Sequence, residues 1–223
     1  MEIIYIDKYV VVCEKPAGTT SEGEGDNSLI TLLSRELSSR GESNTCVFPV
    51  HRLDKDTVGV TVYARSSASA AALSSAITEG RFMKKYFAVL CGAPKEKEGE
   101  LCDLLYYDRT RGKSFVVERE RKGVKSARLK YLLLQTAEDF SLVEVELFTG
   151  RTHQIRVQFA TRGTPLAGDR RYGAPKTDVE RVALCAYSLT FPHPKSGELL
   201  SFQIDAPKTL PWTFFNKTLD SID

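Results

Sequence analysis

Pro49-Val50-His51-Arg52-Leu53-Asp54-Lys55-Asp56-Thr57 runs directly into Val58-Gly59-Val60-Thr61-Val62, and the rest of the chain is organised around this stretch. The second part is rich in β-branched residues, which predicts a buried strand. The first part places a histidine, cations and two carboxylates in a loop that the strand holds. Loops fixed by a rigid element commonly carry catalytic side chains, although a solvated polar turn has the same composition.

Length and composition indicate one ordinary globular protein. The 223 residues are 42% hydrophobic and 27% charged, which is enough for one substantial core, and nothing forces a second domain. We therefore expect a single domain over residues 1–223. No apolar run approaches the length of a membrane span, and the N-terminus lacks the features of a signal peptide. These observations predict a cytoplasmic protein that does not bind a membrane.

The five cysteines are odd in number, far apart and never spaced as Cys-x-x-Cys. This pattern argues against a disulfide framework and against a zinc site. We expect all five to be reduced core residues: Cys13, Cys46, Cys91, Cys102 and Cys185.

Positive charge is concentrated in two segments although the net charge is only +2. Residues 109–130 hold nine Lys or Arg and two Glu, a net +7, and residues 151–176 hold six against one Asp, a net +5. The remainder of the chain therefore carries −10. Such a separation favours a polyanionic partner on one face, although a basic sheet edge in contact with water gives the same pattern.

Hydrophobic periodicity predicts an α+β fold with a largely antiparallel sheet flanked by helices and loops, because successive strands follow one another without intervening helices. Expected helices start near Ser28, with leucines on one face, and near Ser66, ending at Gly80. The expected strands are 2–6, 10–14, 58–62, 81–92, 101–107, 114–118, 127–135, 141–148, 182–191 and 199–204.

Residues 151–162 are expected to form a short helix that Thr152 caps and Gly163 ends. Ile155 and Phe159 are four apart, so one face can be buried while the polar residues occupy the remainder. At the other end of the chain, Trp212, Phe214 and Phe215 are expected to pack the C-terminus onto the core.

Several common chemistries lack their motifs. The chain has no phosphate-binding Gly-x-x-x-x-Gly-Lys-Ser/Thr loop, no dinucleotide-binding glycine motif and no Gly-x-Ser-x-Gly elbow. A metal site would need His51 with Asp54 or Asp56, with or without His153. The spacing permits it, but the many nearby arginines would repel a cation.

A carboxylate nucleophile on a basic surface is the sharper alternative. Positive charge from Arg52, Lys55 and Arg156 would favour the ionised form of Asp54, which could then attack a sugar or base carbon. Tyr86 could transfer a proton or stack on a base. Taken singly, Tyr86 is also typical of a packed strand residue and Arg156 of a surface helix residue.

The chain resembles the RluA-type pseudouridine synthases through several motifs in the same order. They are Lys15-Pro16-Ala17-Gly18, His51-Arg52-Leu53-Asp54-x-x-Thr57-x-Gly59, Lys85-Tyr86-x-Ala88-x-Leu90-x-Gly92, Asp108-Arg109-x-x-Gly112-Lys113, Gly150-Arg151-Thr152-His153-Gln154-Ile155-Arg156-Val157, Gly168-Asp169-x-x-Tyr172-Gly173, Ala183-Leu184-x-Ala186 and Phe191-x-His193-Pro194.

This resemblance implies the pseudouridine synthase catalytic fold, with Asp54 as the catalytic aspartate, Tyr86 as the active-site tyrosine and Arg156 paired with Asp54. The implied reaction breaks the N1 glycosidic bond of a uridine in structured RNA, turns the uracil and joins C5 to C1′, without a cofactor. Arg52 matches the position that can enter the RNA stack in place of the flipped nucleotide. The expected RNA-binding residues are His51, Arg52, Arg109, Lys113, Arg151, His153 and Gln154.

The sequence also departs from the family pattern. Val58 stands where the family commonly has Ser, Cys185 where it commonly has His, and residues 19–25 replace an apolar continuation. We expect no RNA-binding domain of the S4 type before the catalytic region, and therefore expect the catalytic domain or a partner to choose the target. The substrate is expected to be ribosomal or transfer RNA rather than DNA, and the protein a monomer. A non-catalytic RNA-binding module on the same fold is the alternative function.

Overall fold

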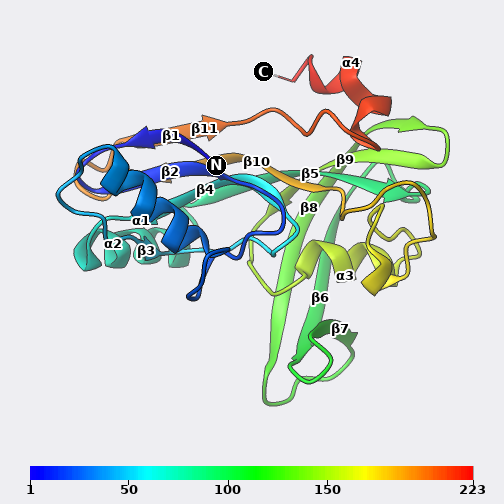
Figure 1. The fold of residues 1–223 in the computed structure, drawn as a ribbon. Helices are drawn as coiled ribbons and strands as arrows, with labels where there is room; N and C mark the ends of the chain where they lie inside the picture. Colours follow the sequence, from blue (N-terminus) through cyan, green and yellow to red (C-terminus); the bar gives the residue numbers. More distant parts are fainter. Residues whose placement is uncertain (223) are drawn as a thin grey trace. The chain divides into compact units, whose positions relative to one another are not determined.

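The computed structural model describes residues 1–222, which form two compact units (Figure 1). Unit 1 comprises Met1–Lys84 and Ala186–Ile204, and unit 2 comprises Lys85–Cys185 with the segment from Asp205 onward. The named strands of each unit pair antiparallel, so the predicted α+β class with a largely antiparallel sheet is confirmed. That both units belong to one domain stays a prediction.

The strands of unit 1 lie close to the predicted ranges. They are β1 (Glu2–Ile6), β2 (Val10–Lys15), β3 (Phe48–Pro49), β4 (Val58–Ala64), β10 (Leu184–Pro192) and β11 (Leu199–Gln203). The strand β2 pairs with β1 on one side and β4 on the other, and β10 pairs with β11. The pairs β1–β2 and β10–β11 each join two consecutive strands as an antiparallel hairpin. The short β3 was not predicted.

Two helices of unit 1 cover opposite faces of its strands (Figure 1). They are α1 (Leu29–Ser39) and α2 (Ser67–Thr78). Successive strand residues point to opposite faces, so Val10 and Val12 share a cluster with Leu73 of α2, whereas Val11 and Cys13 share one with α1. Unit 1 is therefore a three-layer arrangement, and β4 runs through its centre.

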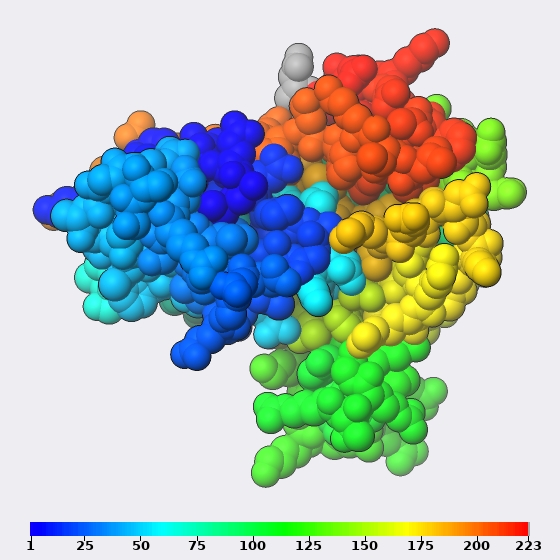
Figure 2. Space-filling model, in the orientation of Figure 1, coloured from blue at the N-terminus to red at the C-terminus, as the bar shows by residue number. Residues whose placement is uncertain are grey.

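Unit 2 is built on five strands in the spatial order β5-β9-β8-β6-β7. Their bounds are β5 (Met83–Cys91), β6 (Glu98–Asp108), β7 (Lys113–Val117), β8 (Val124–Ala137) and β9 (Phe140–Leu147). The hairpin of β6 and β7, with the adjoining end of β8, projects from this unit as a lobe (Figure 2, green). The C-terminal η2 (Trp212–Phe215) packs onto the unit with Trp212 and Phe215 buried, as predicted, and α4 (Asn216–Leu219) follows it.

The helix expected over 151–162 is shorter than predicted. It is α3 (Gln154–Thr161), and the position before it is His153 rather than Thr152. His153 has the left-handed backbone angles φ 54° and ψ 26°, so the helical conformation begins after it, and its carbonyl accepts the first helical bond from the N–H of Val157 (2.9 Å). Burial also extends beyond the Ile155 and Phe159 face, because Gln154, Arg156 and Gln158 are buried too.

The prediction that the cysteines are core residues is partly wrong. All five are free, and Cys13 and Cys185 are buried, but Cys46 and Cys102 are exposed. Cys102 lies on β6, where side chains alternate between the core and water, and its register places it outward. No helix within residues 1–222 is long and apolar enough to cross a membrane.

Candidate active site

The loop that carries Asp54 is held by a buried lysine. Lys15, at the end of β2, has no exposed surface, and its ammonium donates hydrogen bonds to the carbonyl oxygens of Lys55 (2.9 Å), Thr57 (2.8 Å) and Pro16 (3.1 Å). The backbone N–H of Gly18 donates to the Lys55 carbonyl as well. The three N–H donors of one buried ammonium therefore meet three carbonyl acceptors, and these bonds hold the backbone of the loop in place.

Lys15 keeps its positive charge at pH 7 although it is buried. Burial lowers the pKa of Lys15 to about 8, and the carboxylates of Asp56 and Asp54 oppose that shift. The ammonium is therefore still charged at pH 7, when all three of its protons are available to the loop carbonyls. Asp54 itself is half-buried, and Arg52, two residues before it, is exposed.

The strand after the loop needs a glycine at one position. Gly59 has φ 144°, and a Cβ added there would lie 2.5 Å from both the Cβ and the carbonyl oxygen of Ala186 on β10. No side chain can be accommodated at that distance, so the glycine lets β4 and β10 approach closely. The Gly59 of the quoted stretch is thus explained by packing within unit 1.

His51 anchors the beginning of the loop to β4. The backbone N–H of Val62 donates to its Nε2 (3.2 Å), the Thr61 hydroxyl lies 3.2 Å from the same atom, and the ring packs edge-on against Phe82. Burial, and then the charge of Lys84, lower the pKa of His51 to about 3. The ring is neutral near pH 7, so the RNA contact predicted for His51 would be that of an uncharged group.

In unit 2, Arg156 forms a bidentate ion pair with Asp169. The guanidinium Nε and Nη2 lie 2.6 and 2.8 Å from the two carboxylate oxygens, and only 8% and 1% of the two side chains are exposed. The arginine comes from α3, and the aspartate precedes η1 (Arg170–Tyr172). The pair fixes the plane of the guanidinium in the interior, where an unpaired charge would be costly.

Tyr172 connects three elements of unit 2 beside this pair. Its hydroxyl accepts a hydrogen bond from the N–H of Ser114 (2.8 Å) and lies 3.0 Å from His153 Nδ1. Its ring is contacted by the Arg156 guanidinium (5.2 Å) and the Lys113 ammonium (4.7 Å). Burial raises the pKa of Tyr172 to about 12, so the hydroxyl keeps its proton.

The remaining residue of the expected catalytic set is Tyr86. It lies on β5, is 5% exposed and stands opposite Val145 of β9. The strand pairs with β9 from Lys85 to Cys91, which fixes the backbone that carries the ring. The structure therefore places Asp54 in unit 1, and Tyr86 with Arg156 in unit 2.

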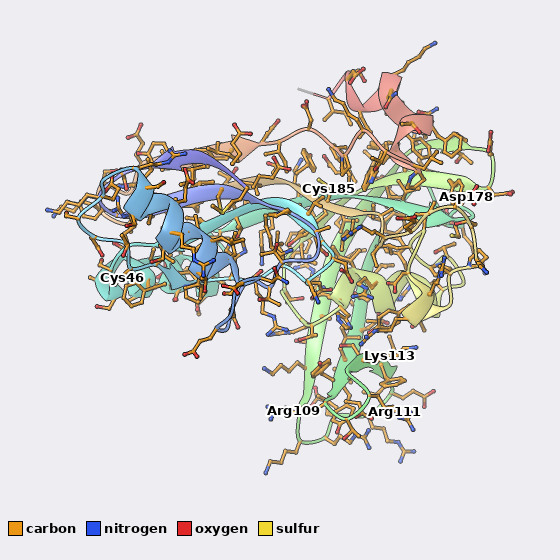
Figure 3. All side chains as sticks on the ribbon, viewed as in Figure 1. Cys46, Arg109, Arg111, Lys113, Asp178 and Cys185 are labelled. Carbon is orange, nitrogen blue, oxygen red and sulfur yellow. The ribbon has the colours of Figure 1, made fainter. Side chains whose placement is uncertain are left out.

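The expected RNA-binding side chains of unit 2 differ in their availability. Arg109 is exposed in the turn between β6 and β7, and Arg111 and Lys113 lie at the same end of the hairpin (Figure 3). The Lys113 ammonium also donates to the carbonyl of Arg171, and Arg151 donates to that of Ser126. These cations are thus part of a folded surface rather than a disordered tail.

Gln154 is occupied inside the protein. Its Oε1 accepts from the Thr149 hydroxyl (2.8 Å) and the Arg151 N–H (3.1 Å), and its Nε2 donates to the Arg128 carbonyl (3.1 Å).

The alternative of a metal site was also considered from the sequence. Residues 1–222 contain no group of three or more His, Cys, Asp or Glu arranged to hold a metal ion.

Known proteins match this chain over nearly its whole length. A profile of RNA pseudouridylate synthases matches residues 9–161. The chain belongs to the RNA pseudouridylate synthase family. Its members are isomerases, and the predicted resemblance to the RluA type is thereby confirmed.

Individual members of the pseudouridylate synthase family agree with this assignment. An uncharacterised RNA pseudouridine synthase of Bacillus subtilis, YlyB, is 34% identical over 94% of this chain and 70% of its own length. A ribosomal large subunit pseudouridine synthase D of Xanthomonas campestris is 34% identical over 94% and 67%. The structure of human RNA pseudouridylate synthase domain containing 4 superposes with a TM-score of 0.78 at 25% identity, covering 98% of this chain and 91% of that chain.

Sequence reasoning missed the residues that support the family's expected catalytic groups. Lys15 and Asp169 both lie in motifs that resemble the family, but neither was given a role. The available signal was a lysine shortly after the apolar run 10–13 and a lone acid within the basic segment 151–176. Because Lys15 and Thr57 are 42 positions apart, the contact itself could come only from the fold.

Proposed function

We propose that this protein converts a uridine in structured RNA to pseudouridine, with Asp54 as the catalytic aspartate, Tyr86 as the active-site tyrosine and Arg156 as the arginine partner of Asp54. The observation that carries the proposal is the family match over residues 9–161, which includes all three positions. The order and spacing of the motifs around them support the same assignment.

The proposed reaction is an isomerisation, so no other reactant is consumed. The N1–C1′ bond of the uridine breaks, the uracil turns while it remains bound, C5 joins C1′, and the proton on C5 is lost as N1 gains one. The carboxylate of Asp54 assists at the sugar, either by adding to it or by promoting departure through a glycal. Held on a loop whose carbonyls are bonded to Lys15, the carboxylate needs little reorganisation to act.

RNA binding is proposed to use the basic surface of unit 2. A uridine within a structured RNA must leave its stack before enzyme groups can reach it, which costs a few kcal/mol that phosphate contacts and stacking can offset. The residues proposed for those contacts are Arg109, Lys113, Arg151, His153 and Gln154, with His51 and Arg52 from unit 1. Among them, Arg52 and Arg109 are exposed.

We further propose that the substrate is ribosomal or transfer RNA, and that the protein acts on it as a monomer in the cytoplasm. Several relatives are named ribosomal large subunit pseudouridine synthase D, which supports ribosomal RNA as the first substrate to test. The same naming supports the cytoplasm as the compartment in which the substrate would be met.

The test is conversion by purified protein, measured as pseudouridine in ribosomal and transfer RNA transcripts. Asp54→Ala should abolish conversion while RNA affinity, measured separately, stays within about twofold. Asp56→Ala is the matched control, because Asp56 is an exposed carboxylate in the same loop and should leave the rate unchanged. Full turnover by Asp54→Ala would exclude the proposed aspartate, and binding without conversion by the wild type would favour the non-catalytic RNA-binding module.

Pseudouridine mapping of total RNA from cells with and without the gene identifies the target. A site that disappears with the gene and returns with the wild type, but not with Asp54→Ala, gives the substrate uridine directly. If no site changes in ribosomal or transfer RNA, these two classes are excluded under the conditions of growth.

A further inference from the structure

Hydrogen bonds hold the backbone carbonyls of the Asp54 loop. The Asp54 carbonyl accepts from the N–H of Thr57 (3.0 Å), and those of Lys55 and Thr57 accept from Lys15. The Leu53 carbonyl belongs to the peptide unit that leads directly into Asp54. What holds that peptide unit decides how the Asp54 side chain is aimed.

The partner of Leu53 is a single serine hydroxyl. Ser21 Oγ donates to the Leu53 carbonyl (2.9 Å) and accepts from the Leu53 N–H (3.0 Å). The side chain is buried, with 4% of the residue exposed. One hydroxyl thus fixes the two peptide planes that immediately precede Asp54, and water cannot take its place without entering the interior.

Ser21 is in turn tied to the rigid part of unit 1. The hydroxyl of Tyr63 donates to the Ser21 carbonyl (2.7 Å). Tyr63 lies on β4, pairs with Val11 of β2 and has no exposed surface. The chain of bonds therefore runs from the centre of the unit 1 sheet through Ser21 to the residue next to Asp54.

We propose that Ser21 is a positioning residue for Asp54: its hydroxyl clamps Leu53 and so sets the direction of the catalytic carboxylate. This inference rests on the proposed function, in which Asp54 is catalytic. It gives the polar segment 19–25 a specific role, because an apolar side chain at position 21 would leave both polar groups of Leu53 buried and unsatisfied.

The clamp predicts a loss in rate rather than in RNA affinity. Ser21→Ala should lower kcat about tenfold or more, since small misplacements of a catalytic group are costly, and should change KM for RNA less than about twofold. Ser21→Thr keeps the hydroxyl and should restore most of the rate. Tyr63→Phe removes only the bond to the Ser21 carbonyl and should have an intermediate effect.

A matched control separates positioning from stability. Ser66 is also in unit 1, where its hydroxyl accepts from the Ser69 N–H and donates to the Ser69 hydroxyl at the start of α2. Ser66→Ala therefore removes two bonds of a serine hydroxyl, as Ser21→Ala does, but away from the loop. Ser66→Ala should leave kcat unchanged. A kcat for Ser21→Ala equal to that of the wild type, or an equal loss in Ser66→Ala, would overturn the proposal.

Amide hydrogen exchange provides a readout that does not depend on activity. The Leu53 N–H should exchange about tenfold faster in Ser21→Ala than in the wild type, while the amides of α2 stay unchanged. If wild-type protein forms no pseudouridine, the proposed function fails, and the exchange measurement alone decides the clamp. Unchanged protection at Leu53 would then reject it.

Discussion

Removing Asp169 should destabilise unit 2 strongly because the buried Arg156 guanidinium loses both of its bonds to that carboxylate. With 8% and 1% of the side chains exposed, the pair lies in the range where losing one partner costs about 3–5 kcal/mol, so we expect that loss for Asp169→Ala. Asp169→Asn keeps the shape and one acceptor but loses the charge. Its expected cost is about 1.5–3 kcal/mol, the contribution of a hydrogen bond to a charged group.

The assay is equilibrium unfolding in urea at pH 7, followed by the fluorescence of Trp212. This is the single tryptophan of the chain, and it is buried in unit 2. Glu100→Ala is the control, because Glu100 binds Arg128 in the same bidentate manner (2.6 and 2.9 Å), but with 42% and 54% of the side chains exposed. The control should cost much less, since water screens an exposed pair. Equal losses in the two variants would refute the argument from burial.

Three further predictions concern other parts of the molecule. Burial lowers the pKa of Lys15 from 10.5, the ordinary value of a lysine, to about 8, so between these pH values the unfolded chain binds a proton that the folded chain does not. The free energy of unfolding of the wild type relative to that of Lys15→Met should therefore rise by up to about 3 kcal/mol from pH 8 to 10.5, and a constant difference in urea unfolding would contradict this. Arg109→Ala should reduce the slope of log affinity for RNA against log salt by about 0.7–0.9, and an unchanged slope would remove Arg109 from the interface. Gly59→Ala should lose about 1–3 kcal/mol of unfolding free energy by circular dichroism because of the contact with Ala186, whereas Gly80→Ala, with nothing within 4 Å of the added carbon, should lose less.

The fold was largely predictable because its elements depend on local periodicity. The apolar, β-branched run 10–13 indicates a strand, and because successive strand residues point to opposite faces, Val10 and Val12 lie in one core cluster and Val11 and Cys13 in the other. The start of α3 was not predictable in this way. A left-handed His153 is stabilised by contacts such as that with Tyr172, 19 positions away, and no pattern within the helix encodes them.

The candidate site was predictable as a set of residues but not as a structure. The charged cluster around Asp54 was visible in the sequence because its members are adjacent. Its supports come from distant positions: Ser21 is 32 residues from Leu53, and Ser114 is 58 from Tyr172. Buried polar groups must be satisfied by some partner, but only the fold determines which partner that is.

Each unit holds its proposed catalytic group by bonds made within that unit. Lys15 and Ser21 fix the backbone around Asp54, and Asp169 fixes the guanidinium of Arg156. Because these bonds form on folding, the cost of burying the charges is met before RNA binds, and the groups need not reorganise during the reaction. It follows that breaking these supports should lower kcat more than it raises KM for RNA, whereas removing an exposed cation such as Arg109 should do the reverse. Equal effects on both constants at both kinds of position would mean that folding and RNA binding are not separated in this way.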